Sequence, residues 1–378
     1  MILFPFFYAV KITILRDVKM KNFIGIKEMS KEEILEVLDV AKKLDDTPNM
    51  ERRKMMNGMI MTSIFFEPST RTRLSFNSAA YKMGLDVIGF DNPDVSSIKK
   101  GESLRDTIIM VSAYSDVIVM RHPIDGAAKF AEEVTDCPII NAGDGSNEHP
   151  SQTLLDLYTI KDELGSIENK KIAFVGDTKY GRTVHSLSKA LKMFNGEFYY
   201  ISPDIIQIPD YILKELDNAK IKYHKGNNYE EILKEIDCLY MTRIQRERFE
   251  NIEDYEKVKH AFNISKSTIV GKCKEDMIIM HPLPRVDEIS IDLDDTKYAK
   301  YFIQAKNGIP TRMAMLALAT GVIESSAKKK EKDYELIENK EIVCQNKKCV
   351  THFEETKNKV ARRSYGDFCY YCNKEITK

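Results

Sequence analysis

Short apolar runs alternate along most of the chain with segments whose apolar residues recur at helical spacing. Four runs predict strands, at 59–66, 86–90, 116–121 and 138–143, and three segments predict helices, at 70–83, 103–114 and 150–163. An earlier helix is predicted from Ser30, because S-K-E-E has the pattern of a capping box. Alternation of this kind predicts a parallel sheet covered by helices.

A second series begins at KIAFVGD (171–177). It predicts strands at 171–177, 197–202, 238–243 and 277–282, and helices at 181–194, 209–218, 253–263 and 310–325. We therefore predict an α/β protein with two doubly wound parallel-sheet domains, at 20–155 and 156–309. The boundary falls inside the 150–163 helix, and helix 310–325 crosses back to the first domain.

Both ends of the chain depart from this alternation. Residues 1–19 begin with ten mostly apolar residues, too few to span a bilayer and without the features of a signal peptide. We interpret 1–19 as an N-terminal extension; a strand or helix on the first domain is the alternative. Residues 326–340 are charged and predict a linker, and 341–378 are too few for an ordinary hydrophobic core.

Composition narrows the classes of function. The 378 residues are 43% hydrophobic and 30% charged, which suits a soluble protein of about two domains. The net charge of −1 gives no overall basic field for nucleic acid, so an anion site must be a local cluster. Without an export or membrane signal we expect a cytoplasmic protein.

Polar residues gather where the predicted strands end. The clusters are Ser69 to Arg73, Arg121-His122, His149 to Gln152, Arg182, Arg243 to Gln245 and His281 to Arg285. The ligand crevice of an open α/β sheet lies at the carboxyl ends of its strands, so these clusters are expected to converge.

The stretch STRT at 69–72 falls at the start of a predicted helix. Unpaired backbone N–H groups, hydroxyls and a guanidinium at such a corner suit a phosphate. A serine N-cap followed by solvated arginines is the alternative that the stretch alone leaves open. Lys99 and Lys100 similarly fit either a binding loop or a solvated basic loop.

Seven cysteines divide into two groups. Cys137, Cys238 and Cys273 are isolated, and we expect buried free thiols. The tail has two pairs, Cys344-x4-Cys349 and Cys369-x2-Cys372, a spacing that predicts one structural, tetrahedral Zn²⁺ per chain. Unrelated thiols are one alternative, and a nucleic-acid-binding zinc ribbon is another, because the tail carries basic and aromatic residues.

Six motifs together resemble the aspartate carbamoyltransferase family. In chain order they are STRTR, MRHP, GDGSNEHPSQTLLDL, GDTKYGRTVHSL, YMTRIQ and HPLPRVDEI, and the resemblance covers residues 22–324. The family condenses carbamoyl phosphate with L-aspartate in pyrimidine (UMP) biosynthesis, giving N-carbamoyl-L-aspartate and phosphate. The resemblance implies this activity here, with no cofactor for the chemistry.

The resemblance also implies roles for individual residues. The catalytic set is Arg71, Thr72, Lys100, Arg121 and His149. Carbamoyl phosphate would be bound by Ser69, Thr70, Arg71, Thr72, Arg121, His149, Gln152, Leu283 and Pro284. Aspartate would be bound by Lys100, Arg182, Arg243 and Gln245, whereas His281 is expected to be structural.

Lys100 and Ser97 are expected to enter the site from a neighbouring subunit of a homotrimer. The loop is one residue longer than in the family, so Ser96 is the alternative to Ser97. Since no residue is an obvious nucleophile or general base, we expect direct attack by the amine, with electrostatic stabilisation of the tetrahedral intermediate.

An ornithine or related carbamoyltransferase is the nearest alternative. That family resembles this one but has HCLP where this chain has HPLP, and its substrate needs acidic contacts. Here Pro282 and the TRIQ motif with Arg243 favour a dicarboxylate.

The tail has its own resemblance. The stretches VCQNKKCVTHFEE and CYYCNKE resemble the zinc domain of the regulatory chain of aspartate carbamoyltransferase, which docks on catalytic subunits. The chain is thus expected to be a fusion of the two, with possible assembly beyond a trimer left open. No counterpart of the regulatory nucleotide-binding domain is present in 1–378, so we expect no feedback by CTP or ATP through such a domain.

Overall fold

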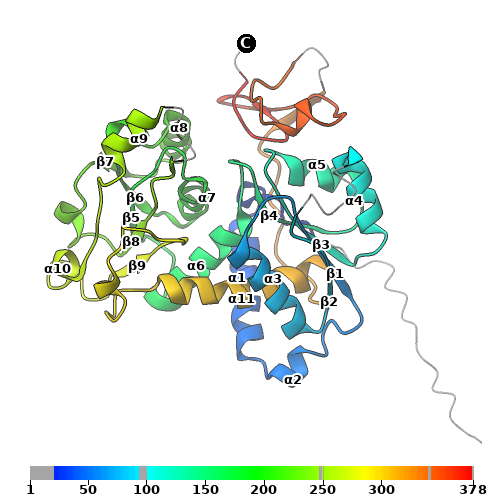
Figure 1. The fold of residues 1–378 in the computed structure, drawn as a ribbon, viewed down its shortest axis with the longest axis horizontal. Helices are drawn as coiled ribbons and strands as arrows, with labels where there is room; N and C mark the ends of the chain where they lie inside the picture. Colours follow the sequence, from blue (N-terminus) through cyan, green and yellow to red (C-terminus); the bar gives the residue numbers. More distant parts are fainter. Residues whose placement is uncertain (1–20, 93–99, 247–248, 250, 339–341, 377–378) are drawn as a thin grey trace, which may run out of the picture.

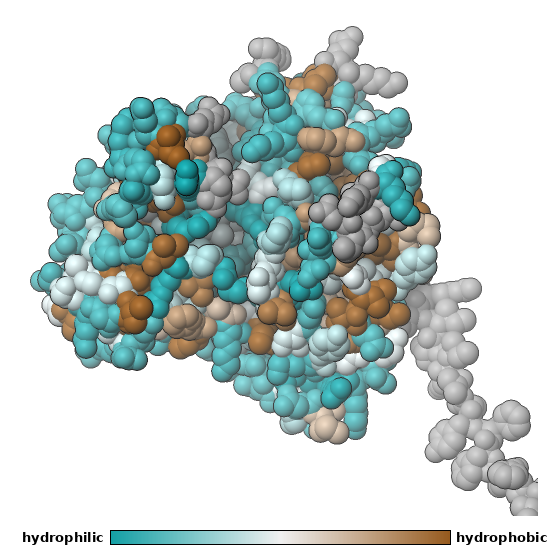
Figure 2. All heavy atoms as spheres, viewed as in Figure 1, coloured by the Kyte–Doolittle hydropathy of each residue, from teal (hydrophilic) through white to brown (hydrophobic). Residues whose placement is uncertain are grey.

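The computed structural model describes residues 21–92, 100–246, 249, 251–338 and 342–376. Two parallel sheets lie side by side, and a small antiparallel sheet lies above the first of them (Figure 1). The predicted extension at 1–19 falls outside the described residues. In the face shown in Figure 2 the surface is mostly hydrophilic, with separate apolar patches.

The first sheet has the strand order β2-β1-β3-β4 and is parallel throughout. Its strands are β1 (Ile60–Phe65), β2 (Asp86–Phe90), β3 (Val117–His122) and β4 (Ile139–Asp144). Val117 and Val119 pack into one hydrophobic cluster, whereas Ile118 and Met120 pack into another on the opposite face. Both faces are therefore covered, which explains why the strands are continuous apolar runs.

The second sheet is parallel, with the order β7-β6-β5-β8-β9. Its strands are β5 (Lys171–Val175), β6 (Glu197–Ile201), β7 (Tyr223–Gly226), β8 (Cys238–Met241) and β9 (Ile278–Met280). Ile172 and Phe174 face the cluster that continues into the first domain, and Ala173 and Val175 face a separate one. The predicted pair of doubly wound α/β domains is confirmed.

Helices cover the two parallel sheets and connect them (Figure 1). They are α1 (Lys31–Asp46), α2 (Asn49–Arg52), α3 (Thr70–Met83), α4 (Leu104–Ser112), α5 (Ala127–Val134), α6 (Pro150–Leu164), α7 (Arg182–Leu191), α8 (Asp210–Asn218), α9 (Ile252–Val258), α10 (Lys266–Ile269) and α11 (Tyr301–Ala319). None of them, within the described ranges, combines the length and apolar character needed to cross a membrane.

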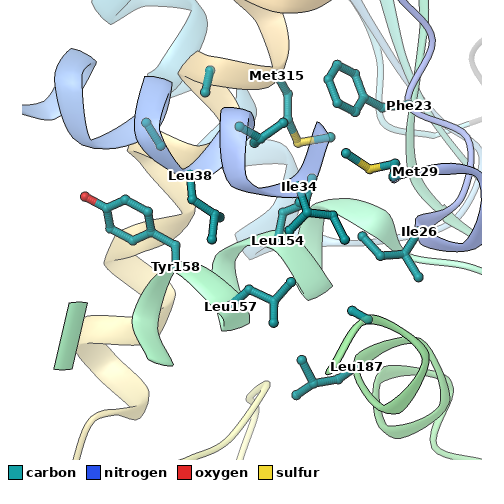
Figure 3. Packing of buried hydrophobic residues seen from close by; sticks show 14 of the residues in the cluster. Phe23, Ile26, Met29, Ile34, Leu38, Leu154, Leu157, Tyr158, Leu187 and Met315 are labelled. Carbon is teal, nitrogen blue, oxygen red and sulfur yellow. The ribbon is translucent and has the colours of Figure 1, made fainter. Parts of the chain in front are cut away.

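The helices α1, α6 and α11 form the centre of the molecule. Figure 3 shows Leu154 and Leu157 of α6 between α1 and Leu187 of α7, with Met315 of α11 nearby. All four side chains are fully buried or nearly so. Because α6 and α11 run between the two sheets, polar side chains on them are held at fixed positions between the domains.

Local capping signals in the sequence are confirmed. Ser30 accepts a hydrogen bond from the Glu33 amide, and the Glu33 side chain accepts one from Ser30. Ser103 caps α4 by accepting from the Asp106 amide. Gly84 ends α3 in the left-handed region, at φ 94°.

The last large helix differs from its prediction. It was predicted at 310–325 but begins at Tyr301, continues through Pro310 and ends at Ala319. A proline at the start of a helix is favourable, whereas a proline inside a helix costs about 3 kcal/mol. The helix start was predicted at Pro310 for this reason. Burial of nearly every residue from Gly308 to Ala319 against α1, α3 and α6 outweighs that cost.

Several elements and two thiol environments also differ. The sequence did not predict β7, a polar edge strand without an apolar run, or the short helix α5. Of the three isolated cysteines, Cys238 is buried as expected, while Cys137 and Cys273 are only half-buried.

The third sheet belongs to the tail and is antiparallel, with the order β10-β11-β12. Its strands are β10 (Glu335–Glu338), β11 (Lys359–Arg363) and β12 (Gly366–Cys369). Because β10 lies inside the predicted 326–340 linker, that segment is not a linker over its whole length. Its mostly exposed, charged residues gave no strand pattern.

Candidate active site

A cavity of about 590 Å³ lies between the two parallel sheets, where their strands end. Twelve predicted site residues line it: Ser69, Thr70, Arg71, Thr72, Arg121, His149, Gln152, Arg182, Arg243, Gln245, Leu283 and Pro284. They come from six separate strand ends, so the expected convergence is confirmed.

The first wall of the cavity is the turn between β1 and α3. Ser69 is the N-cap residue of α3, but its hydroxyl makes no capping hydrogen bond. Thr72 is buried one turn into the helix, while Thr70 and Arg71 are exposed. The hydroxyl of Ser69 therefore does not cap the helix, which argues against the simple N-cap alternative. The backbone amides at the start of α3 lie at the cavity.

Arg121 lies next to the last residue of β3 and His149 precedes α6, and the two side chains meet beside Gly143. Arg121 forms an ion pair with Glu67 at 2.8 Å and donates to the Ala142 carbonyl at 3.3 Å. A Cβ on Gly143 would lie 3.1 Å from the guanidinium of Arg121 and 3.4 Å from the His149 ring. Glycine here, with φ 119°, lets these groups approach one another.

The imidazole of His149 is neutral at neutral pH. Burial holds the pKa of His149 well below its ordinary value, and the cations Arg182, Arg121 and Arg312 lower it further. The Ser151 hydroxyl lies 3.3 Å from Nδ1. If Ser151 donates this hydrogen bond, the ring proton is on Nε2.

The opposite wall comes from the second sheet. Arg182 is the first residue of α7 and donates a hydrogen bond to the Gly145 carbonyl of the first domain. Arg243 and Gln245 follow β8, and they line the cavity together with Thr242. Two guanidiniums of the second domain thus face the β1–α3 turn of the first domain.

The loop after β9 closes the remaining side. His281 is buried, its Nδ1 accepts from the Leu283 amide at 2.7 Å and its Nε2 lies 2.8 Å from Glu288. Both ring nitrogens hold this loop in place, as expected for a structural histidine. Leu283 and Pro284 are held at the cavity as a result.

Sequence reasoning missed several polar residues of the site. Arg312 on α11 lines the cavity with its guanidinium 4.9 Å from the centre of the Phe76 ring, and burial lowers its pKa to about 10. Asp156 lies on α6 below the cavity, and burial raises its pKa to about 7. The available signal was a single charge in each apolar helical run, LLDLY and PTRMA.

One predicted part of the site is not at this cavity in the single chain. Lys100 is exposed and does not line the cavity. Ser96 and Ser97 lie outside the described residues. The expectation that this loop serves a neighbouring subunit stays a prediction.

The tail contains a candidate metal centre. The sulfur atoms of Cys344, Cys349, Cys369 and Cys372 all lie within 4.8 Å of one another, and all four residues are buried. Four converging thiols suit a tetrahedral ion such as zinc.

The tail docks on the first domain next to α5 (Figure 1). Asp125 forms a short parallel bridge with the tail, since its amide donates to Lys348 at 3.0 Å and its carbonyl accepts from Val350 at 2.9 Å. Tyr371 donates to Glu133 at 2.8 Å, and a Cβ on Gly126 would lie 2.8 Å from Tyr371. The contact is therefore specific and close.

Two family models match the two large domains. Residues 21–162 match the carbamoyl-P binding domain of aspartate/ornithine carbamoyltransferase, and residues 168–319 match its Asp/Orn binding domain. Both models end before the tail.

Relatives and solved structures agree with these models. An aspartate carbamoyltransferase catalytic subunit from Brachyspira hyodysenteriae is 77% identical, over 95% of this chain and 100% of the relative. The catalytic subunit of Methanocaldococcus jannaschii aspartate transcarbamoylase is 52% identical, with a TM-score of 0.74 over 79% of this chain and 98% of that one. The Trypanosoma cruzi enzyme in complex with N-(phosphonacetyl)-L-aspartic acid is 38% identical, with a TM-score of 0.73 over 80% of this chain and 96% of that one.

Proposed function

The chain belongs to the aspartate/ornithine carbamoyltransferase family, and we infer that it transfers the carbamoyl group of carbamoyl phosphate to the amine of L-aspartate. The products are N-carbamoyl-L-aspartate and phosphate, as in pyrimidine biosynthesis. The observation that carries this function is the pairing of a phosphate corner on one domain with two arginines on the other, in a chain 77% identical to a relative of that activity.

The phosphate of carbamoyl phosphate would bind at the start of α3. Ser69, Thr70 and Thr72 supply hydroxyl and amide donors, and Arg71 supplies a planar fork for two phosphate oxygens. A dianion at this corner also gains from the positive end of the helix dipole.

The carbamoyl carbonyl would be polarised by Arg121, His149 and Thr72. A neutral His149 with its proton on Nε2 donates a hydrogen bond to the oxygen as negative charge builds there. Fixed donors of this kind typically contribute about 3 kcal/mol each to the barrier reduction. Gln152 and the carbonyls of Leu283 and Pro284 would hold the carbamoyl NH₂.

The reaction proceeds by direct attack of the neutral aspartate amine on the carbamoyl carbon. The new C–N bond forms a tetrahedral intermediate, the C–O bond to phosphate then breaks, and the amine proton passes to the departing phosphate. Among the cavity residues no side chain is arranged as a nucleophile with an adjacent base, so the chemistry needs positioning and charge stabilisation.

Arg182 and Arg243, with Gln245 beside them, would bind the carboxylates of aspartate. This arrangement disfavours ornithine, whose side-chain amine needs a carboxylate. Of the two acidic residues that line the cavity, Glu67 pairs with Arg121, and Asp177 accepts a hydrogen bond from the Tyr180 amide.

Lys100 would complete the site from a neighbouring subunit, with Ser97 or Ser96 on the same loop. A trimer with shared sites follows from this assignment. Its support is that Lys100 is exposed and apart from the cavity of its own chain.

The tail would hold one structural Zn²⁺ and act as a docking module derived from a regulatory zinc domain. Its aromatic residues support docking over nucleic-acid binding, because Phe368 and Tyr371 are buried and Tyr371 bonds to Glu133 of the first domain. The thiols require a reducing compartment, which agrees with the cytoplasm.

The test of function is product identity. Purified protein of known metal content is incubated with carbamoyl phosphate and either aspartate or ornithine. We expect carbamoyl-aspartate, no citrulline and an aspartate saturation curve unchanged by CTP. Citrulline as the main product would refute the assignment, and a shift of the curve with CTP would refute the proposed lack of nucleotide control.

A further inference from the structure

Asp156 is a buried carboxylate one helical turn beyond Gln152 on α6. Its exposure is 0%, and its Oδ1 accepts hydrogen bonds from Gln152 Nε2 at 2.9 Å and Gln304 Nε2 at 2.6 Å. Its Oδ2 accepts from the Tyr240 hydroxyl at 2.8 Å. One carboxylate thus joins α6, α11 and β8 below the proposed carbamoyl subsite.

The acceptors of Asp156 determine which way two amide side chains turn. Oδ1 of Asp156 accepts both of these hydrogen bonds, so Gln152 and Gln304 both direct their NH₂ groups towards this oxygen. The oxygen end of the Gln304 side chain supports this orientation, because its Oε1 accepts a hydrogen bond from the His281 amide at 2.8 Å. For Gln152, which lines the cavity, the carbonyl oxygen Oε1 is the end left for a ligand.

The shape of the cavity does not by itself determine the orientation of the Gln152 side-chain amide. The oxygen and NH₂ ends of an amide are nearly the same size, so a glutamine without a directing partner presents either end. Asp156 removes that freedom at Gln152. It also holds the loop after His281 through Gln304, and this loop carries the Leu283 and Pro284 carbonyls.

We propose that Asp156 determines specificity for a carbamoyl group by holding Gln152 with its carbonyl oxygen towards the substrate NH₂. This inference rests on the proposed function. A methyl group in place of the NH₂ cannot donate, and it leaves acceptors in the cavity unpaired, which is an effective way to reject an analogue. Asp156 is a positioning residue, because it acts through Gln152 and Gln304.

The test compares carbamoyl phosphate with acetyl phosphate, which has a methyl group at that place. In Asp156→Asn the new amide can donate to Gln152, so Gln152 can turn its NH₂ to the cavity. The measured quantity is the Ki of acetyl phosphate divided by the KM of carbamoyl phosphate. We expect this ratio to fall by about tenfold, the value of one hydrogen bond. An unchanged ratio in folded Asp156→Asn overturns the proposal.

Tyr240→Phe is the matched control. It removes the hydrogen bond to Oδ2 of the same carboxylate and leaves the Oδ1 contact with Gln152, so the ratio is expected to stay at the wild-type value. An equal fall in both variants would mean a general disturbance and would overturn the proposal.

Gln152→Met provides a second test of the proposal if Asp156→Asn does not fold. It removes the acceptor itself and has to lower the same ratio, so an unchanged ratio here also overturns the proposal. Wild-type protein that forms no carbamoyl-aspartate would instead refute the proposed function, which separates the two failures.

Discussion

The side chains of the cavity carry an excess of positive charge before any ligand is bound. Its lining includes five arginines and two carboxylates, and three of the arginines, Arg182, Arg121 and Arg312, lower the pKa of His149. Such a field favours a phosphate dianion and a dicarboxylate together. Burial and these cations keep His149 neutral, as its proposed role as a donor to the carbonyl oxygen requires.

Arg243→Ala tests the carboxylate assignment. We expect the KM for aspartate to rise by roughly 30-fold or more, the loss of a charge-assisted pair worth about 2–3 kcal/mol, with the KM for carbamoyl phosphate much less affected. Steady-state kinetics with each substrate varied in turn measures both constants. An unaltered KM for aspartate would contradict the assignment.

His122 gives a pH prediction for stability. Burial lowers its pKa to about 4, so the folded protein resists protonation that the unfolded chain accepts below pH 6.5. Above pH 6.5 His122 is neutral in both states and does not reduce the free energy of unfolding. As the pH falls towards 4, the unfolded chain binds a proton at His122 and the free energy of unfolding falls by up to about 3 kcal/mol.

His122→Asn removes this titration and keeps an acceptor near the Ile124 amide, which His122 Nδ1 accepts from at 3.1 Å. Urea unfolding midpoints at pH 7.5 and 4.5 are the measurement. The wild type should lose more stability on acidification than the variant. Equal losses would show that His122 is not responsible.

At the scale of elements, the tail contributes to the start of α4. Glu354 accepts a hydrogen bond from the Leu104 amide at 2.7 Å, so a carboxylate of the tail satisfies a free N–H at the N-terminus of this helix. Lys100 lies just before α4. The tail therefore supports the segment that carries a proposed catalytic lysine.

Glu354→Ala is expected to lower kcat/KM for aspartate about fivefold, because a lost helix cap is worth about 1 kcal/mol and loosens the chain before α4. The metal content should stay unchanged. Glu355→Ala, an exposed neighbour, is the control. Equal kinetics in the two variants would remove this link between tail and site.

At the scale of the whole molecule, the site is divided among separate bodies. One domain supplies the phosphate corner, the other supplies Arg182 and Arg243, and α6 and α11 hold the two together through a shared core (Figure 3). The proposed Lys100 would come from another chain.

Mixing two inactive variants tests this division. Lys100→Ala and His149→Ala are dissociated, mixed and reassembled, and activity should return in up to about a quarter of the sites if Lys100 acts in a neighbour. Arg71→Ala mixed with His149→Ala should regain none, since both residues belong to the same chain's cavity. Failure of the first mixture would place the whole site in one chain.

The sequence by itself determined the features that follow from local period and local chemistry. Apolar runs covered on both faces specify parallel strands, the Ser30 box and Gly84 specify helix ends, and polar clusters at six strand ends specify where the cavity forms. Each of these depends on residues a few positions apart, which a linear pattern records.

Only the tertiary structure decided the features that depend on distant partners. Pro310 lies inside a helix because packing on α1, α3 and α6 outweighs its cost, and β10 is a strand because β11 pairs with it. The neutral His149 and the role of Asp156 arise from burial and from neighbours up to 163 residues away, such as Arg312 on α11. Burial, pairing and charge are properties of contacts in space, and no local pattern encodes them.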